Sequence, residues 1–320
     1  RRDEERMKIL VTGGTGFIGS YLARYLNRIG YDVTICDNNS RGKLDDSVKN
    51  LNFIECDLTD KSDLEKLDTD YDYVYHLAAI NGTPNFYEIP HLVLKVNTLC
   101  NINILDWCVE NNIKNILSAS SSEIYASTDN IQIPTSEDVI ASIDDVHNER
   151  FSYAGSKIFG ELLFINYAKQ YGLNTKIIRP HNIYGSRMGF EHVIPQVVKR
   201  IFDGESPFKI YGHYQTRSFC HINDCVKQIK SVMESKTSDI VFNIGSGEET
   251  NIRELVETIF EILNYDPYVL LVDAPKGSTD RRCPDMSLLE SIGGYSDEVS
   301  LFDGLKETCE WYMRNYREKI

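Results

Sequence analysis

The sequence predicts an α/β protein in which a doubly wound parallel sheet is followed by a smaller α+β domain. Three observations carry this prediction. A short apolar run, 9–11, enters a glycine-rich turn and then a helical pattern of apolar residues. Further strand-like runs alternate with long helical patterns as far as residue 180, which favours right-handed crossovers and a parallel sheet. Beyond residue 180 the expected elements are shorter and the loops longer.

The glycine-rich turn joins the first strand to the first helix. Gly13 permits a tight turn, Gly16 lets the backbone approach a diphosphate, and Gly19 lets the helix pack on the strand. Phe17 and Ile18 begin the helix, whose N-terminal N–H groups and dipole favour an anion. These five residues are predicted to bind a dinucleotide.

Asp37 supports the dinucleotide prediction. It ends the second expected strand, 32–36, and follows Gly19 by 18 residues. A carboxylate at that distance accepts hydrogen bonds from the ribose of an adenosine and disfavours a 2′-phosphate. The predicted cofactor is therefore NAD rather than NADP, in a Rossmann-type domain. The alternative is a strand-end aspartate that caps a turn.

Composition excludes several classes of protein. A chain of 320 residues allows one large or two modest domains, and a net charge of −14 argues against a nucleic-acid partner. No apolar run approaches the roughly 20 residues that cross a bilayer, and no signal-peptide pattern opens the sequence. The opening residues, RRDEER, are expected to lie outside the fold, which begins near residue 7. The eight cysteines form no metal-like cluster, which predicts reduced thiols in a cytoplasmic protein that holds no metal.

The third expected strand, 51–56, ends at Asp57 and Leu58. The carboxylate at this strand end can accept a hydrogen bond from an adenine amine. It can also serve as the N-cap of the following expected helix, 59–67.

The fourth expected strand, 73–77, ends at Leu77 and is followed by Ala78 and Ala79. Small residues at the carboxyl end of a strand leave room for a cofactor that crosses above the sheet. His76, within this strand, is expected to pack in the core.

Two long helical patterns, 90–111 and 152–171, are separated by a fifth strand, 113–119, and followed by a sixth, 175–179. Tyr153 and Lys157 lie four residues apart, and therefore on one face of the second helix. A lysine beside a phenol favours the phenolate, as does a nicotinium charge. Because a dinucleotide fold and a serine-bearing strand end precede this pair, we predict that it is catalytic.

The region after residue 180 is predicted to form a smaller lid over the ends of the sheet. Its expected elements are a helix at 191–202, a strand at 208–211, a basic turn at 215–219, a helix at 224–234, a strand at 240–244, a helix at 251–263 and a loop holding Arg281 and Arg282. A hinge between two such layers is a preferred place for a substrate. The predicted domains are 7–180 and 181–320, and some later segments are free to return to the first sheet.

Seven motifs in order resemble the extended short-chain dehydrogenase/reductases that act on nucleotide sugars: TGGTGFIG, HLAA, SSSEIY, YAGSK, HNIYG, QTRSF and DRRCPD. The resemblance covers residues 7–312. It implies NAD on the glycine turn, with Asp37 at the ribose and Asp57-Leu58 at the adenine. It also implies that the two long helices form the four-helix bundle of a homodimer.

The resemblance also implies a catalytic triad of Ser121, Tyr153 and Lys157. Tyr153, as phenolate, takes a proton from a sugar hydroxyl, usually at C4, while Ser121 hydrogen-bonds the same oxygen. The hydride passes to the nicotinamide, which leaves a keto-sugar, and Lys157 holds the ribose.

The substrate contacts follow from the same resemblance. Asn182 matches an asparagine that touches the phosphate of the nucleotide sugar. Arg217 and Arg282 match contacts to the diphosphate or the sugar, for which arginine is suited because it binds phosphate bidentately.

Glu123 bears on the fate of the keto-sugar. Many 4-epimerases of the family have a neutral residue there, whereas 4,6-dehydratases and UDP-glucuronate decarboxylases have Glu. A carboxylate beside a 4-keto-sugar can remove the C5 proton, and the alternative is a glutamate that faces solvent. Two differences from the family pattern argue against a dehydratase or a decarboxylase. Ser122 stands where dTDP-glucose dehydratases have Asp, and residues 80–87 replace the proline-rich loop of the decarboxylases.

The segment 179–196 resembles epimerase members, including the GDP-mannose 3,5-epimerase group. That group has Cys at the position of Glu123 and Lys at the position of His192. His192 is assigned to substrate binding, as a histidine of the lid loop in the preferred interpretation and as a second acid/base in the alternative.

The leading hypothesis is an NAD-dependent nucleotide-sugar epimerase that acts through a transient keto-sugar. Its closest competitor is a 4,6-dehydratase or a UDP-glucuronate-type decarboxylase that uses Glu123. A remote alternative is an NAD-binding regulator without turnover, against which the complete triad argues.

Overall fold

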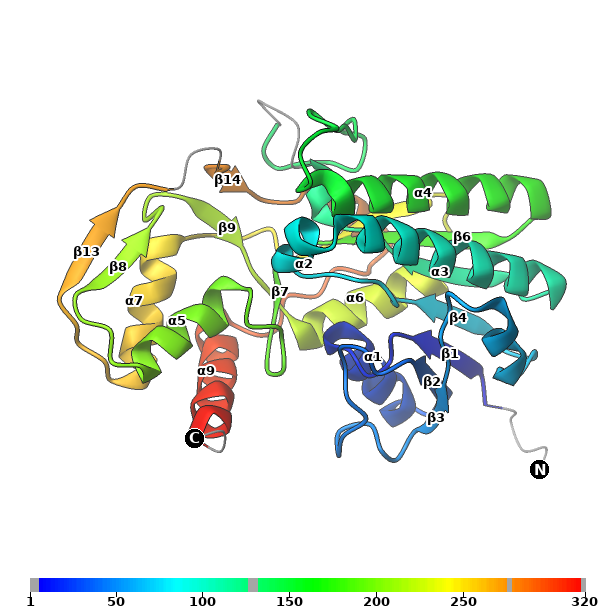
Figure 1. The fold of residues 1–320 in the computed structure, drawn as a ribbon, viewed down its shortest axis with the longest axis horizontal. Coiled ribbons are helices and arrows are strands. Elements are labelled where there is room, and N and C mark those ends of the chain that lie inside the picture. Colours follow the sequence, from blue (N-terminus) through cyan, green and yellow to red (C-terminus); the bar gives the residue numbers. More distant parts are fainter. Residues whose placement is uncertain (1–5, 126–131, 275–277, 318–320) are drawn as a thin grey trace. The chain divides into compact units, whose positions relative to one another are not determined.

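The computed structural model describes residues 6–125, 132–274 and 278–317 and divides the chain into two compact units (Figure 1). The first unit takes in the described residues of Arg1–Thr128, Ile140–Arg179 and Ile229–Phe242; the second takes in those of Asp129–Val139, Pro180–Gln228 and Asn243–Ile320. The sequence predicts two contiguous domains, 7–180 and 181–320. They stay a prediction, because a division into compact units does not test which segments fold as a domain.

A seven-stranded sheet confirms the predicted fold class. Its order is β11-β6-β5-β4-β1-β2-β3, and the pairings from β3 to β6 are parallel. The strands are β1 (Lys8–Thr12), β2 (Asp32–Asp37), β3 (Asn52–Glu55), β4 (Tyr73–His76), β5 (Asn115–Ala119), β6 (Asn174–Pro180) and β11 (Val241–Ile244). The order places β1 and β4 side by side, which is the switch point where such sheets bind dinucleotides.

The core explains why these strands form. Ile9, Leu10 and Val11 of β1 are fully buried, as a strand covered on both faces requires. Leu10 belongs to a cluster of buried side chains that also includes Ile104 and Phe164 of the two long helices.

The helices of the first unit are α1 (Phe17–Arg28), α2 (Thr83–Glu88), α3 (Pro90–Glu110) and α4 (Phe151–Tyr171), with the short 3-10 helices η1 (Lys61–Lys66) and η2 (Ser122–Tyr125). Helices α3 and α4 pack side by side (Figure 1). The helix expected at 59–67 is wrong in type and start: it is η1, and its N-cap is Asp60, whose carboxylate accepts from the Ser62 amide. Asp57 therefore does not cap it.

Helix α3 is long and apolar enough to span a bilayer, and it alone meets that test within the described part of the chain. Half of the apolar window is buried inside the protein. A buried core helix passes the same test.

The second unit contains small sheets and short helices. Three sheets are formed by β7 with β10, by β12, β9 and β14, and by β13 with β8. The strands are β7 (Ile183–Tyr184), β8 (Phe208–Tyr211), β9 (Thr216–Ser218), β10 (Cys220–His221), β12 (Glu249–Asn251), β13 (Val269–Val272) and β14 (Arg281–Arg282). The helices are α5 (Val193–Phe202), α6 (Ile222–Glu234), which continues into the first unit, α7 (Ile252–Leu263), α8 (Ser287–Ser291) and α9 (Leu301–Arg317).

Candidate active site

The turn between β1 and α1 has the geometry that a diphosphate requires. Gly13 has a φ of +67°, and a Cβ added there would lie 2.9 Å from the Ala78 amide nitrogen. A Cβ added at Gly19 would lie 2.1 Å from the Gly13 carbonyl oxygen. Neither position accepts a larger residue without a shift of backbone, so the turn lies close against the end of β4.

The N-terminus of α1 is open to an anion. Gly16 is the extended N-cap residue, no side chain caps the helix, and the first turn carries no acidic residue. Phe17 and Ile18 therefore begin a helix whose first N–H groups face the turn without a competing carboxylate. These residues fit a dinucleotide diphosphate.

Asp37 accepts two backbone hydrogen bonds, from the Thr15 amide at 3.1 Å and the Asn39 amide at 2.9 Å. The carboxylate thus ties the end of β2 to the glycine turn, which is the capping role considered from the sequence. Each carboxylate oxygen accepts more than one hydrogen bond, so the ribose role of Asp37 is compatible with these contacts and stays a prediction.

Asp57 and Leu58 follow β3 in a turn. The Asp57 carboxylate accepts from the amide and the hydroxyl of Thr59, at 2.9 and 2.7 Å. Leu58 is buried, and its carbonyl accepts from the Asn103 side chain at 2.8 Å. The adenine role of this pair stays a prediction.

The end of β4 is held by Thr12 of β1. The Thr12 hydroxyl accepts from the amides of Leu77 and Ala78, at 3.1 and 3.2 Å, ahead of Ala79. His76 is a core histidine, as predicted: its ring hydrogen-bonds Thr12 and Asn101, and burial lowers its pKa to about 3.

The structure brings Ser121, Glu123 and Tyr153 together in the first unit. The Glu123 amide donates to the Ser121 hydroxyl at 3.1 Å. Burial raises the pKa of the Tyr153 hydroxyl, the Glu123 carboxylate raises it further, and a hydrogen bond with Ser121 and the Arg41 guanidinium lower it. Glu123 is therefore close enough to act on the tyrosine electrostatically.

Lys157 lies beside the same ring, with its Nζ 5.4 Å from the centroid of Tyr153. The ammonium donates to the Ala119 carbonyl at 2.8 Å. Burial lowers its pKa to about 8.

Three further side chains around this site were missed by sequence reasoning. Phe86 of α2 stacks on Tyr153, with ring centroids 4.7 Å apart. The Asn97 side chain bonds the amide and the carbonyl of Ile80, and Arg41 donates to the Asn81 carbonyl at 3.0 Å. Phe86 lies in the stretch 80–87 that follows HLAA, whereas Arg41 and Asn97 belong to no motif that the sequence analysis singled out.

The second unit holds the predicted substrate residues. Asn182 has a φ of +41°, a left-handed conformation that asparagine adopts more readily than most residues. Arg282 of β14 is the register partner of Arg217 of β9. His192 is the exposed N-cap residue of α5, and its side chain does not cap the helix.

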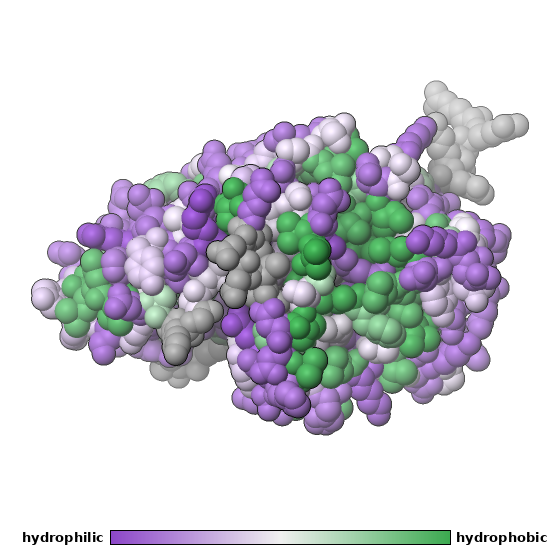
Figure 2. All heavy atoms as spheres, turned by 90° about the horizontal axis from the view of Figure 1, so that it is seen from above, coloured by the Kyte–Doolittle hydropathy of each residue, from purple (hydrophilic) through white to green (hydrophobic). Residues whose placement is uncertain are grey.

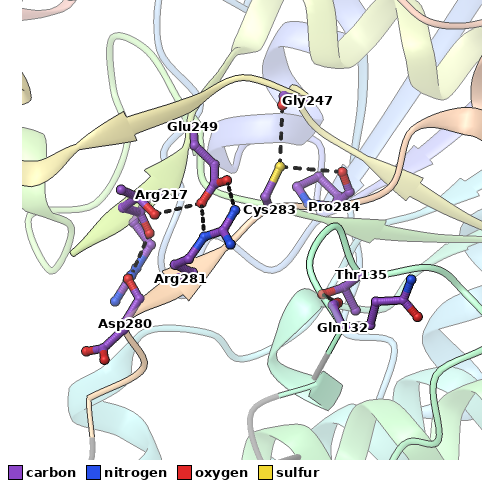
Figure 3. Close-up of polar contacts among 10 residues, drawn as sticks. Gln132, Thr135, Arg217, Gly247, Glu249, Asp280, Arg281, Cys283 and Pro284 are labelled. Atoms are coloured by element: carbon purple, nitrogen blue, oxygen red, sulfur yellow. Dashed lines mark hydrogen bonds and ion pairs between the residues drawn. The ribbon is translucent and has the colours of Figure 1, made fainter. Parts of the chain in front are cut away.

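The arginines of this unit have different partners (Figure 3). Arg217 donates to the carbonyls of Thr216 and Thr279, both at 2.7 Å. Arg281 points at Glu249 and donates to it at 3.0 Å (Figure 3). The ion pair with Glu249 neutralises Arg281, whereas the hydrogen bonds described for Arg217 hold its guanidinium against backbone carbonyls.

The parallel sheet, the glycine turn and the Ser-Tyr-Lys constellation define a dinucleotide-dependent enzyme. Residues 9–245 match the sequence model of the NAD-dependent epimerase/dehydratase family, and the chain belongs to this family. It is an NAD-dependent enzyme of the nucleotide-sugar epimerase, dehydratase and decarboxylase group.

Two solved structures and one curated relative illustrate the match. UDP-N-acetyl-alpha-D-glucosaminuronate decarboxylase of Bacillus cytotoxicus is 32% identical, over 96% of this chain and 98% of the relative. UDP-glucose 4-epimerase of Thermotoga maritima with UDP-glucose has a TM-score of 0.86 and 29% identity, over 97% and 100%. A dTDP-glucose 4,6-dehydratase of Streptomyces venezuelae with NAD has a TM-score of 0.85 and 27% identity, over 98% of both chains.

Proposed function

We propose that this chain is an NAD-dependent nucleotide-sugar epimerase that acts through a transient keto-sugar. The observation that carries the proposal is the convergence of Ser121, Tyr153 and Lys157 at the carboxyl end of the sheet. When bound, NAD supplies the acceptor and the donor of the hydride. An epimerase needs no further reactant, because the hydride returns to the same carbon from the other face of the sugar.

Tyr153 is the base of the proposed reaction. Its hydroxyl is buried and in contact with Ser121, which can hydrogen-bond the same sugar oxygen. Lys157 is fixed by the Ala119 carbonyl and has two further N–H donors for a ribose.

Asn182, His192, Arg217 and Arg282 are proposed to bind a nucleotide-diphosphate sugar. The chemistry of Arg217 supports this role: a guanidinium binds a diphosphate bidentately, and the carbonyls of Thr216 and Thr279 hold this one in place. The left-handed backbone of Asn182 is the kind of strain found at ligand-binding positions.

Decarboxylation of a nucleotide-linked uronic acid is the second candidate, and Glu123 favours it. This carboxylate acts on Tyr153 electrostatically, as an acid/base group for C5 chemistry would. The Bacillus relative also carries out a decarboxylation according to its name. Dehydration is the third fate of the same keto-sugar.

We also propose that the chain is a cytoplasmic homodimer. Leu92 and Leu94 of α3 and Phe159 and Leu162 of α4 are exposed, and hydrophobic side chains gather on the face that carries α4 (Figure 2). An apolar patch on two adjacent helices suits a second copy of the same helices. Phe159→Glu and Leu162→Glu are expected to yield monomers in light scattering, whereas Leu271→Glu, on β13, leaves the mass unchanged. A monomeric wild-type chain would contradict the dimer.

Product analysis tests the proposed function. Protein loaded with NAD is incubated in D2O with UDP-, GDP-, dTDP- and CDP-sugars, including uronic acids, and the products are followed by proton NMR. An inverted centre without change of mass is the expected result. Loss of carbon dioxide or a 4-keto-6-deoxy product would overturn it in favour of the second or third candidate, and Glu123→Gln should then abolish that product. Turnover unaffected by Glu123→Gln supports epimerisation.

A further inference from the structure

A buried ion pair lies one helical turn behind the catalytic lysine. Glu161 follows Lys157 by four residues on α4, and it is 9% exposed. Its two carboxylate oxygens accept from Nε and Nη2 of Arg179 on β6, at 2.9 and 2.7 Å. Arg179 is 5% exposed. The bidentate geometry satisfies both charges, as a buried ion pair requires.

The same guanidinium reaches the turn that carries Ser121. Nη1 of Arg179 donates to the Tyr125 hydroxyl at 2.8 Å, and the guanidinium carbon lies 5.1 Å from the centre of that ring. Tyr125 is the last residue of η2, which also contains Glu123. The ion pair therefore connects the helix of Tyr153 and Lys157 to the turn of the other site residues.

A cavity of about 10 Å³ lies between Lys157 and Glu161. Ser120 and Asn101 also line it. The Ser120 hydroxyl is buried and finds no hydrogen-bond partner among the described residues. A cavity of this size is at the lower limit for one water molecule, which needs two to four polar partners, and the four side chains offer them.

The charged and titratable groups around Lys157 come from several elements. His76 faces it from β4, Cys100 from α3, and Tyr153 and Glu161 from α4, with Arg179 behind Glu161 on β6. Burial raises the pKa of the Tyr153 hydroxyl, so this neighbour is neutral. His76 and Cys100 are neutral, because burial lowers the pKa of the histidine and raises that of the thiol to about 12. The Glu161–Arg179 pair is therefore the charged neighbour that can act on the ammonium.

We propose that Glu161 is a positioning residue that keeps Lys157 protonated, with its charge balanced by Arg179 and transmitted through one water bound at Ser120 and Lys157. While the pair is intact, its net charge is zero and the ammonium is tolerated. Removal of either partner leaves an unbalanced charge beside Lys157. The consequence for the reaction rests on the proposed function, in which Lys157 holds the cofactor ribose as a cation.

The test exploits the opposite signs of the two partners. Glu161→Gln leaves Arg179 unbalanced and should lower the pKa of Lys157 by about one unit or more, whereas Arg179→Gln leaves Glu161 unbalanced and should raise it. The double variant removes both charges and should return the pKa toward the wild-type value. The titration is followed by NMR on protein labelled with [6-13C]lysine, with Lys157→Met used to assign the signal.

A role in packing alone predicts a different pattern, because all three variants would lose stability and none would move the titration in a charge-dependent direction. Shifts of the same sign in both single variants, or no shift in folded variants, would overturn the proposal. If Glu161→Gln does not fold, Arg179→Gln and the double variant still decide the question.

The NMR readout does not require turnover, so the two proposals fail separately. If the pKa of Lys157 shifts in the charge-dependent directions but the chain converts no sugar, only the proposed function is contradicted. In an active chain, Glu161→Gln should also cost about fivefold in kcat/KM at pH 8, because a drop of one unit from a pKa of about 8 lowers the protonated fraction of Lys157 there from about one half to about one tenth. If the chain is active and the variants leave the titration of Lys157 unchanged, only the role of Glu161 is contradicted.

Discussion

The ring of Tyr153 stacks on the ring of Phe86, with centroids 4.7 Å apart and planes 11° apart. Phe86 belongs to α2, and its carbonyl accepts from the Ser152 hydroxyl at 3.3 Å. The stack and this hydrogen bond fix the orientation of the first turn of α4. The Tyr153 hydroxyl is thereby held toward Ser121 before any substrate arrives, which is the preorganisation that a general base needs.

Tyr153→Phe should abolish turnover while the fold stays intact. The stack on Phe86 is kept, because only the hydroxyl is removed, and the loss of a general acid/base is worth about 10²–10⁴-fold in kcat. Steady-state kinetics and calorimetric titration with NAD check both parts. An affinity for NAD within a few-fold of wild type is expected, and kcat above one tenth of wild type would contradict the role of Tyr153.

Lys157 should set an alkaline limit on activity. Burial lowers its pKa to about 8, so the ammonium is lost above that pH in the free enzyme. The kcat/KM of wild type should fall about tenfold for each pH unit above the limit. Lys157→Arg keeps its charge at all accessible pH values, so this variant should be slower but should not lose kcat/KM at alkaline pH. If kcat/KM of Lys157→Arg still falls at alkaline pH, another group causes the limit.

Gly13→Ala and Gly172→Ala form a matched pair, with φ values of +67° and +64°. A Cβ at Gly172 meets no atom within 4 Å, so this variant should lose only the roughly 1 kcal/mol of a left-handed alanine. A Cβ at Gly13 would meet the backbone of Leu77 and Ala78. Gly13→Ala should therefore lose more stability, and tenfold or more in affinity for NAD, as measured by urea unfolding and calorimetry. Equal behaviour of the two variants would contradict the close approach at Gly13.

His76 should make the protein sensitive to acid. Burial lowers its pKa to about 3 in the folded chain, whereas an unperturbed histidine has a pKa of about 6.5, so the unfolded chain binds the proton first as the pH falls. The free energy of unfolding should drop by roughly 2 kcal/mol between pH 6 and pH 4 from this residue alone. Urea titrations of wild type and His76→Gln at several pH values isolate the effect. The same slope in both proteins would show that carboxylates cause the whole acid response.

Much of the fold was predictable because its signals are local. The apolar run 9–11 and the glycine turn specify β1 and α1 without reference to distant residues. The strand at 240–244 was predicted, but not its place beside β6, since a strand pattern does not identify its neighbour. Helix α2 was missed because its six residues include Pro84 and are too short for a periodic pattern.

The residues of the candidate site were likewise predictable only where the signal is local. The pair Tyr153 and Lys157 was predictable because the spacing of one helix places both on one face. Phe86 and Arg41 were not, since each reaches the site from a distant segment and has no motif of its own. Glu161 and Arg179 pair across 18 residues, and only the packing of α4 on β6 brings them together.

The central claim is that hydride leaves C4 of a nucleotide sugar and returns to the same molecule. A nucleotide sugar labelled with deuterium at C4, chosen as the one that the panel shows to be converted, tests it most directly. Retention of deuterium at C4 of the product, together with a primary isotope effect on kcat and no exchange with solvent, is the predicted result. Replacement of the C4 deuterium by solvent hydrogen, or conversion without an isotope effect in protein freed of NAD, would contradict oxidation by Tyr153, Ser121 and Lys157.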